Sequence, residues 1–535
     1  MRKNIKYILL LLFSGLLSPA CKDLDLAPID KASDLTFWEK KQDAINAVNA
    51  CYSDIYDAET LIFGESLSDN SYTKSNNGSL VRDVANGNYD AAHPLMQQVW
   101  AQRYAGIRRC NTVLANIDKV TDLDATLNKR LTAEARFIRA FHYFILVNHF
   151  GDVPLVETEL SIEEAGKVTR NERQAVIDFI YRELDLAYQD LPKNTEYGAE
   201  DAGRITKGAA LALKARMELY NGEWSKVVST TQQLMAGTDA GSYSLYPSYS
   251  GLFKSENENN SEIILDVQYM PVRRTHGIQY FLIPPTEGGY AAISPSQELV
   301  NNYIMTNGKA ISETGSGWNE NDPYANRDPR LKSTIAYHGY EWTRPDGSKV
   351  TINTNKGTGD NSIGYSSNTT ATGYYVAKFF DPSAQNLVNS GLNLPLIRFA
   401  DVLLMHAEAQ MELGQLNEAV WNATIAKIRQ RAGFSDAAAL NFPGVPANAL
   451  KSVIRSERRS ELAMEGLRVF DIRRWKTAET VLNGWLHGIK TDNQAADQGY
   501  ERVDQRVFDP GKHYLWPVPQ SERDKNSLLV QNPNW

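Results

Sequence analysis

Two segments of the chain share a pattern of small and apolar residues that restricts the fold more than any other feature. Residues 206–235 and 398–431 both have apolar residues at helical spacing, and in both an alanine stands seven residues before a glycine. The pairs are Ala215 with Gly222 and Ala407 with Gly414. The alanine lets two helices approach closely, and the glycine permits a tight turn between them. We therefore expect helix–turn–helix repeats of the tetratricopeptide type; two unrelated hairpins are the alternative.

The sequence between these hairpins has a different character. Residues 238–395 hold 13 of the 26 tyrosines, together with Trp318 and Trp342 and many Gly, Asn, Ser and Pro. Helical periodicity is weak there, and a loop-rich segment of this length inside a compact protein is usually functional. We predict a mainly α fold, in which a single domain at 34–535 combines a helical scaffold (about 34–237 and 396–535) with a large irregular insertion that carries the binding region.

Apolar periodicity predicts further helices before the first hairpin. Thr36 and Glu39 form a capping-box pattern at the start of a helix whose apolar face includes Ala44 and Val48. The other predicted helices cover 94–118, 125–149 and 172–191. Residues 60–92 hold many Gly, Asn, Ser and Asp, so we expect a long loop with short elements there.

The first 21 residues have the features of an export signal. A basic start is followed by an apolar run of about ten residues, too short to span a bilayer, which needs about 20. Small or turn-forming residues then lead to Cys21. This pattern is typical of a bacterial lipoprotein signal peptide at 1–20, with lipid attached to Cys21 and a polar tether at 21–33. An ordinary signal peptide with an incidental cysteine is the alternative.

Charge and composition exclude several classes of protein. The net charge is −8 without a long basic block, which argues against nucleic acid as the main partner. With 42% apolar and 22% charged residues, the chain is expected to be globular. Beyond Cys21 only Cys51 and Cys110 remain, and both fall in predicted helices. They could form a disulfide in an exported chain, or stay as two buried free thiols; the sequence leaves both alternatives.

No catalytic motif is found. The sequence has no HExxH, paired CxxC or GxSxG motif, and His142 and His149 share a helix face with apolar residues, as core histidines do. We therefore predict no catalytic residue, metal or cofactor, although a structural calcium ion is possible among the many Asp and Asn. Glycoside hydrolysis needs only two carboxylates about 5 to 9.5 Å apart, so a surface glycosidase stays an alternative.

The strongest charged motif lies at 457–475. Six residues recur there at steps of three and four, so their side chains would form one stripe of mixed sign on a single helix. They are Arg458, Glu461, Glu465, Arg468, Asp471 and Arg474. We interpret them as a structural ion-pair ladder that joins this helix to its neighbours; a catalytic role is the alternative.

Several segments resemble the SusD/RagB family of surface nutrient-binding lipoproteins of Bacteroidetes-type bacteria, in the family's order and over nearly the whole chain. They are FWEKKQDAINAVNACYSDIY (37–56), RRCNTVLANID (108–118), EARFIRAFHYFILVNHFGDVPLV (134–156), RITKGAALALKARMELYNGEW (204–224), LPLIRFADVLLMHAEAQ (394–410), ERRSEL…EGLRVFDIRRW (457–475) and YLWPVPQSE (514–522) before a final QNPNW. Cys21 with Lys22, Asp23 and Asp25 also looks like that group's export signal, which implies the outer face of the outer membrane.

The resemblance implies tetratricopeptide-like helix pairs carrying a loop-built binding region. It also implies non-catalytic capture of a glycan and its delivery to a SusC-like TonB-dependent outer-membrane transporter. Some family members capture peptides instead, and a purely structural lid over the transporter is a further alternative.

Sugar binding predicts a particular kind of site. A flat aromatic ring covers the apolar C–H face of a sugar, and neighbouring polar side chains bond its hydroxyl rim. The candidates are aromatic and polar residues of loops that we expect to be exposed: Asp69, Asn70, Tyr72, Tyr280, Tyr290, Trp318 and Tyr324. Trp318 is the first choice, because its neighbours in GSGWNEND cannot bury it, whereas Trp100 and Trp475 lie in helical motifs and are expected in the core.

Overall fold

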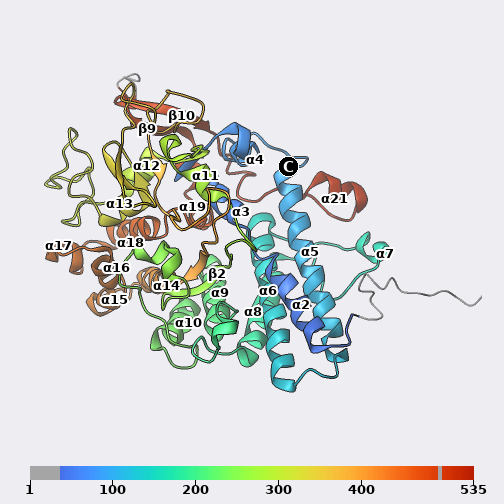
Figure 1. The fold of residues 1–535 in the computed structure, drawn as a ribbon. Coiled ribbons are helices and arrows are strands. Elements are labelled where there is room, and N and C mark those ends of the chain that lie inside the picture. Colours follow the sequence, from blue (N-terminus) through green and yellow to red (C-terminus); the bar gives the residue numbers. More distant parts are fainter. Residues whose placement is uncertain (1–36, 492–496) are drawn as a thin grey trace, which may run out of the picture.

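Helices dominate the computed structural model, which describes residues 37–491 and 497–535, and the predicted mainly α fold is confirmed (Figure 1). The longer helices that precede the insertion run from blue to green in Figure 1. They are α2 (Lys41–Tyr52), α5 (Pro94–Asn116), α6 (Ala125–Phe150), α8 (Arg173–Asp190), α9 (Lys207–Tyr220) and α10 (Trp224–Ala236). Successive helices contact one another, α5 with α6, α6 with α8, α8 with α9 and α9 with α10.

Helix α6 contacts α2, α5, α8 and α9, and it is buried on nearly all sides. Almost every residue from Leu131 to Phe150 is buried, including His142 and His149, which are core histidines as predicted. Asp124 accepts a hydrogen bond from the Leu127 amide and so begins the helix.

Both predicted hairpins are present. The first consists of α9 and α10, and Gly222 between them has φ +73°. In the second, α14 (Phe399–Glu412) ends at a turn with Gly414 at φ +68°. Its returning helix is interrupted at Thr424, between α15 (Glu418–Ala423) and α16 (Ile425–Ala432). Helix α10 packs against α14, so the two hairpins adjoin although the insertion separates them in sequence.

The insertion contains short elements joined by loops, in green and yellow in Figure 1. Its helices are α11 (Ile278–Leu282), α12 (Gln297–Asn302) and α13 (Pro329–Thr334). Its strands are β2 (Ile263–Val267), β3 (Ile293–Pro295), β4 (Ile335–Ala336), β5 (Tyr340–Thr343), β6 (Lys349–Ile352), β7 (Tyr375–Val376) and β8 (Leu394–Arg398). They pair antiparallel as β2 with β8, β4 with β7 and β5 with β6, while β3 pairs with β1 (Ser71–Thr73) from the N-terminal part.

The scaffold also contains the remaining elements of its N-terminal and C-terminal parts. The segment predicted as a long loop at 60–92 carries α3 (Ala58–Gly64), the 3-10 helix η1 (Glu65–Leu67), β1 and α4 (Ser75–Ala85). Helix α7 spans Ile162–Ala165. The C-terminal part holds α17 (Ala437–Leu440), α18 (Ala447–Glu461), α19 (Arg468–Arg474), α20 (Ala478–Val481), the antiparallel pair β9 (Gly484–Lys490) and β10 (Tyr500–Arg506), and α21 (Gln520–Lys525).

The prediction of one helix over 457–475 is wrong. Helix α18 ends at Glu461 and α19 begins at Arg468, with Met464 and Gly466 at positive φ between them. The amides of these two residues donate instead to the buried carboxylate of Glu65, at 3.2 and 2.8 Å. The six charged residues therefore do not share one helix face.

The start of the first helix also differs from its prediction. Helix α2 begins at Lys41, where the Asp43 carboxylate accepts a hydrogen bond from the Lys40 amide (2.9 Å), and residues 37–40 form turns. Thr36, the signal peptide, Cys21 and the predicted tether at 21–33 lie outside the described residues.

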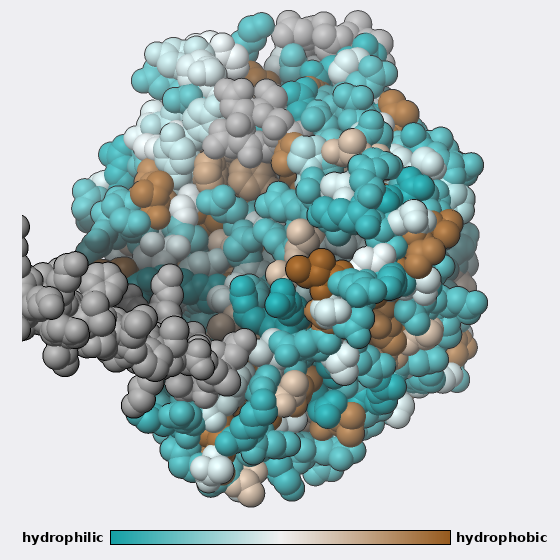
Figure 2. Space-filling view, turned by 90° about the vertical axis from the view of Figure 1, so that its right-hand side faces the viewer, coloured by the Kyte–Doolittle hydropathy of each residue, from teal (hydrophilic) through white to brown (hydrophobic). Residues whose placement is uncertain are grey.

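One apolar core cluster joins the scaffold to the insertion, since Phe144, Tyr303 and Trp421 all belong to it. Cys51 and Cys110 are both buried in this core as free thiols, and burial raises the pKa of Cys110. Viewed from the side of α7, the surface is largely hydrophilic with scattered hydrophobic patches (Figure 2). None of the described helices combines the length and apolar character needed to cross a membrane.

The turn after α14 tests whether the hairpin depends on glycine. Nothing lies within 4 Å of a Cβ placed on Gly414, so Gly414→Ala would add only the strain of positive φ. We expect it to lower the free energy of unfolding by about 1 kcal/mol, measured by urea denaturation. Gly166→Ala is the control, because its φ is −71° and its Cβ would make ordinary 3.6 Å contacts. Equal effects of the two substitutions would contradict the role of Gly414.

Candidate functional site

Trp318 and Tyr324 line one cavity of about 300 Å³, together with residues of α12, β9 and β10. Both side chains are half-buried. The other aromatic residues of this wall are Tyr374 and Tyr500. Amide and imidazole groups lie beside them, from Gln297, Asn301, Asn321, His338 and Asn355. The cavity thus combines aromatic rings with several groups that donate and accept hydrogen bonds.

The ring of Tyr324 is held in place by its neighbours. It stacks on Tyr337, with ring centroids 4.0 Å apart and planes inclined by 18°. Its hydroxyl donates to that of Tyr374 (3.4 Å), which in turn donates to Gln297 on α12 (2.6 Å). The indole N–H of Trp318 donates to the Pro323 carbonyl at 3.3 Å. The rings of Trp318 and Tyr324 are therefore held in fixed orientations before a ligand binds.

Arg327 attaches the loop that carries these rings to the end of α12. Its guanidinium, only 6% exposed, donates to the carbonyl oxygens of Val300 (2.5 Å), Tyr303 (2.7 Å) and Pro323 (2.8 Å). Burial lowers the pKa of Arg327. Lys490 of β9 forms an ion pair with Glu320 of the same loop. The loop at 318–327 is thus anchored on two sides.

Tyr280 and Tyr290 form a second aromatic group that does not line this cavity. Their rings are nearly parallel, with centroids 6.0 Å apart. The ammonium of Lys74 lies 4.8 Å from the Tyr290 ring centroid and donates to the carbonyl oxygens of Tyr290 and Ser367. Burial lowers the pKa of Lys74 to about 8.

Asp69, Asn70 and Tyr72 are not exposed, contrary to the prediction. They retain 3%, 1% and 8% of their accessible surface. The Asp69 carboxylate pairs with Arg459 (3.0 Å) and Arg468 (2.8 Å), which hold its pKa well below the usual range against the effect of burial. Tyr72 lies in β1, which pairs with β3 inside the protein, and Asp69 and Asn70 directly precede this strand, so the three residues belong to the framework of the fold.

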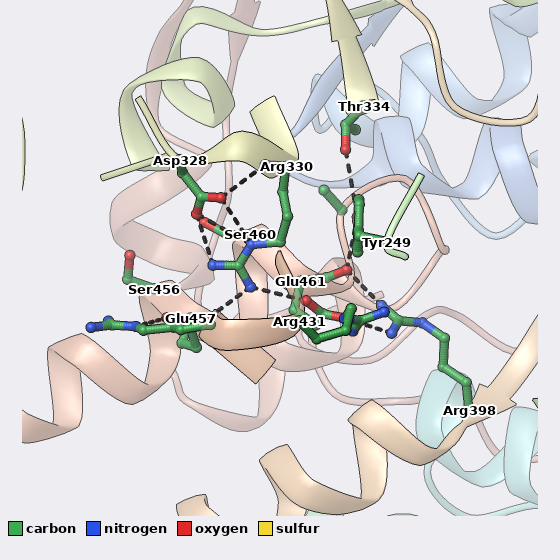
Figure 3. Close-up of polar contacts among 12 residues, drawn as sticks. Tyr249, Asp328, Arg330, Thr334, Arg398, Arg431, Ser456, Glu457, Ser460 and Glu461 are labelled. Atoms are coloured by element: carbon green, nitrogen blue, oxygen red, sulfur yellow. Dashed lines mark hydrogen bonds and ion pairs between the residues drawn. The ribbon is translucent and has the colours of Figure 1, made fainter. Parts of the chain in front are cut away.

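Buried ion pairs connect the insertion to the scaffold, and their centre is Glu461, the last residue of α18. Figure 3 shows Arg330 from α13, Arg398 from the end of β8 and Arg431 from α16 directed towards its carboxylate. The Nη1 atoms of Arg330 and Arg398 lie 2.9 and 2.6 Å from Glu461 oxygens. Burial raises the pKa of Glu461, but the three guanidiniums outweigh this and lower it to about 2.

Further carboxylates extend this network. Arg330 also pairs with Asp328 and Glu457, and Arg398 with Glu262 and Glu465. The ammonium of Lys378 donates to Glu465 at 2.7 Å.

The remaining residues of the charged motif pair with other elements. Arg458 contacts Asp401 (2.5 Å) and Asp471 (2.8 Å), and Arg474 contacts Glu408 (2.6 Å) and Asp471 (2.8 Å). These buried ions pair with one another and join α14, α18 and α19.

Of the residues that line the cavity, sequence reasoning named Trp318 and Tyr324 and missed the others, among them Tyr374, Tyr500 and Arg327. Tyr374 stands in TATGYYV, an aromatic residue beside glycine, which was a usable signal. Tyr500 lies outside the insertion, and Arg327 acts through backbone carbonyls that no motif identifies.

In the described parts of the chain, no group of three or more His, Cys, Asp or Glu is placed to hold a metal ion.

Removing the central carboxylate tests the network. Glu461→Gln removes the carboxylate that Arg330, Arg398 and Arg431 share and leaves one buried positive charge of the network uncompensated, so we expect a loss of about 3–5 kcal/mol in the free energy of unfolding at pH 7. Glu157→Gln, which breaks a half-exposed pair with Arg182, should change it by less than about 1 kcal/mol.

The pH dependence gives a second readout. Because the folded-state pKa of Glu461 is about 2 and its ordinary value is 4.5, its contribution is present above pH 4.5 and lost as the pH falls towards 2. The Glu461→Gln variant should lack this part of the acid destabilisation of the wild type. An unchanged pH profile would contradict the role of Glu461.

Comparison with known proteins agrees with this architecture. The SusD family model matches residues 252–535, and a model described as starch-binding associating with outer membrane matches residues 24–219. The chain is 24% identical over 529 residues to SusD-like protein P2 of Formosa agariphila, covering 96% of both proteins.

Two solved structures share the fold. A SusD-like carbohydrate-binding protein of Bacteroides fragilis matches with a TM-score of 0.83 and 28% identity, over 92% of this chain and 100% of that protein. A laminarin-binding SusD-like protein matches with a TM-score of 0.69 and 24% identity, over 93% of this chain and 100% of its own. Since the first family model covers more than half of the sequence, this chain belongs to the SusD family.

Proposed function

We propose that the protein captures a glycan at the cell surface without cleaving it and delivers it to a SusC-like TonB-dependent transporter of the outer membrane. The cavity carrying Trp318 and Tyr324 is the observation on which this proposal rests. The family description, starch-binding associating with outer membrane, supports both the ligand class and the location. The laminarin-binding relative supports a polysaccharide ligand.

The aromatic rings and the polar groups of the cavity would contact different parts of a sugar. Trp318 and Tyr324 cover the C–H faces of sugar rings, while Asn301, Asn321 and Asn355 exchange hydrogen bonds with hydroxyl groups. A site built from a few such contacts binds with micromolar to millimolar affinity, about −8 to −4 kcal/mol. Weak binding suits a protein that passes its ligand to a transporter.

The carboxylates of the cavity favour binding over hydrolysis. Cleavage of a glycosidic bond requires two carboxyl groups, one on each side of the bond. Among the described residues that line the cavity, the carboxylates are those of Glu320 and Asp322, and Glu320 forms an ion pair with Lys490. We therefore assign the protein a non-catalytic role.

The binding site can be tested with a panel of soluble polysaccharides and the soluble form, residues 22–535. We expect one class to bind and Trp318→Ala to weaken its binding about tenfold, because the ring loses contact worth about 1.4 kcal/mol. Trp485→Ala is the matched control, since Trp485 lies on β9, is 39% exposed and does not line the cavity.

The same experiment separates the alternatives. Mass analysis of the glycan after incubation should show an intact polymer, and shortened products would overturn the non-catalytic assignment. Equal weakening by Trp318→Ala and Trp485→Ala would place binding elsewhere. Binding of peptides, with no binding of any glycan, would show that the ligand is a peptide and would overturn the proposed glycan ligand.

The anchor is tested separately in cells. We expect Cys21→Ala to abolish incorporation of labelled palmitate and to remove the protein from the outer-membrane fraction, because two or more acyl chains are needed for stable anchoring. Cys51→Ala is the control, since Cys51 lies buried in the core and should leave the label unchanged. Label retained by the Cys21→Ala variant would exclude lipidation at this position.

A further inference from the structure

A second cavity, of about 380 Å³, lies between α3, α5, α6 and α19 and shares no residue with the Trp318 cavity. Its volume falls within the range of small-molecule sites. Polar side chains, among them Asp57, Glu59, Thr60 and Gln98, line part of its wall. The other part is apolar and is formed by Leu61, Phe63, Val99, Ile145, Val469 and Phe470. A ligand of this cavity must therefore bury an apolar body.

Arg103 of α5 places a positive charge in this wall. The residue is 3% exposed. Its hydrogen bonds to described residues all come from Nη1, which donates to the carbonyl oxygens of Asp54 (3.2 Å) and Ile55 (2.6 Å). The same atom lies 3.5 Å from His142 Nδ1. Its Nε–H has no hydrogen-bond partner within the part of the chain that the structure describes. Among the described carboxylates, none lies within 4.0 Å of the guanidinium.

The protein offers only partial compensation for this charge. The guanidinium carbon lies 5.2 Å from the ring centroid of Tyr56, which also lines the cavity. Asp57 is nearby, but its carboxylate accepts from the amide (2.7 Å) and hydroxyl (2.6 Å) of Thr60 and so caps α3. A buried guanidinium without a counter-ion is costly, and an anion beside it would relieve that cost.

His149 and Trp516 add unsatisfied polar atoms to the same wall. Their rings stack with centroids 3.9 Å apart. His149 Nδ1 and Trp516 Nε1 are both buried and have no hydrogen-bond partner among the described residues. Burial and nearby arginines lower the pKa of His149 well below its ordinary value, so its ring is neutral at pH 7.

We propose that this cavity binds an apolar molecule with one carboxylate group, with the carboxylate beside Arg103 and the apolar body along the wall of α3, α5 and α19. A charge-assisted hydrogen bond to a guanidinium is strong where water is excluded. A neutral glycan fits less well, because it would leave the Arg103 charge without a counter-ion and would place hydroxyl groups against the apolar side chains.

Isothermal titration with decanoate and with decanol tests this assignment on the soluble form, residues 22–535. The two probes have the same chain length, and only decanoate carries the charge. We expect saturable binding of decanoate at one site, with at least tenfold weaker binding of decanol. Arg103→Met should remove this preference. Arg108→Met is the matched control, because Arg108 is an exposed arginine of the same helix that does not line this cavity.

A variant that fills the cavity keeps the test decisive if Arg103→Met fails to fold. Val99 is half-buried and lines the cavity, so Val99→Trp should block both probes and leave glycan binding at the Trp318 site unchanged. No saturable decanoate binding, equal binding of decanoate and decanol, or an equal loss in the Arg108→Met variant would each overturn the proposal.

Discussion

The contact between Glu461 and three arginines is the interaction on which the rest of the structure depends. The arginines come from α13, β8 and α16, and they meet the carboxylate at the end of α18. Charges removed from water are tolerated only with close partners, so these elements are restricted to positions that bring their ions together. An insertion with little regular secondary structure thereby acquires a defined place on a helical scaffold.

This constraint extends to the proposed glycan site. Arg330 enters the network from α13, and three residues earlier Arg327 binds carbonyl oxygens at the end of α12 and at Pro323. The loop bearing Trp318 and Tyr324 is therefore anchored at its end by buried guanidiniums. Its rings stay half-buried and can meet a ligand without first becoming ordered, which lowers the entropic cost of weak binding.

Arg103 and Arg327 illustrate two uses of a buried arginine that pairs with no carboxylate in the described part of the chain. Arg327 has each of its three nitrogens bonded to carbonyl oxygen, so it serves as a structural link. Arg103 uses only Nη1 in this way and faces a partly apolar cavity, which is why it indicates an anionic ligand. The proposed carboxylate site and the glycan site would thus act in separate parts of one molecule.

Local patterns in the sequence determined the helices at 94–118, 125–149 and 172–191, the two glycine-linked hairpins and the loop-rich insertion with Trp318 and Tyr324. These features depend on neighbours three or four residues apart, which periodicity records directly. Only the tertiary structure decided that Asp69 is buried and that α18 and α19 are separate. Asp69 meets Arg468, 399 residues away, and Glu65 meets the Gly466 amide, 401 residues away. Pairing across such distances depends on how packed helices bring distant segments together, and no local pattern encodes it.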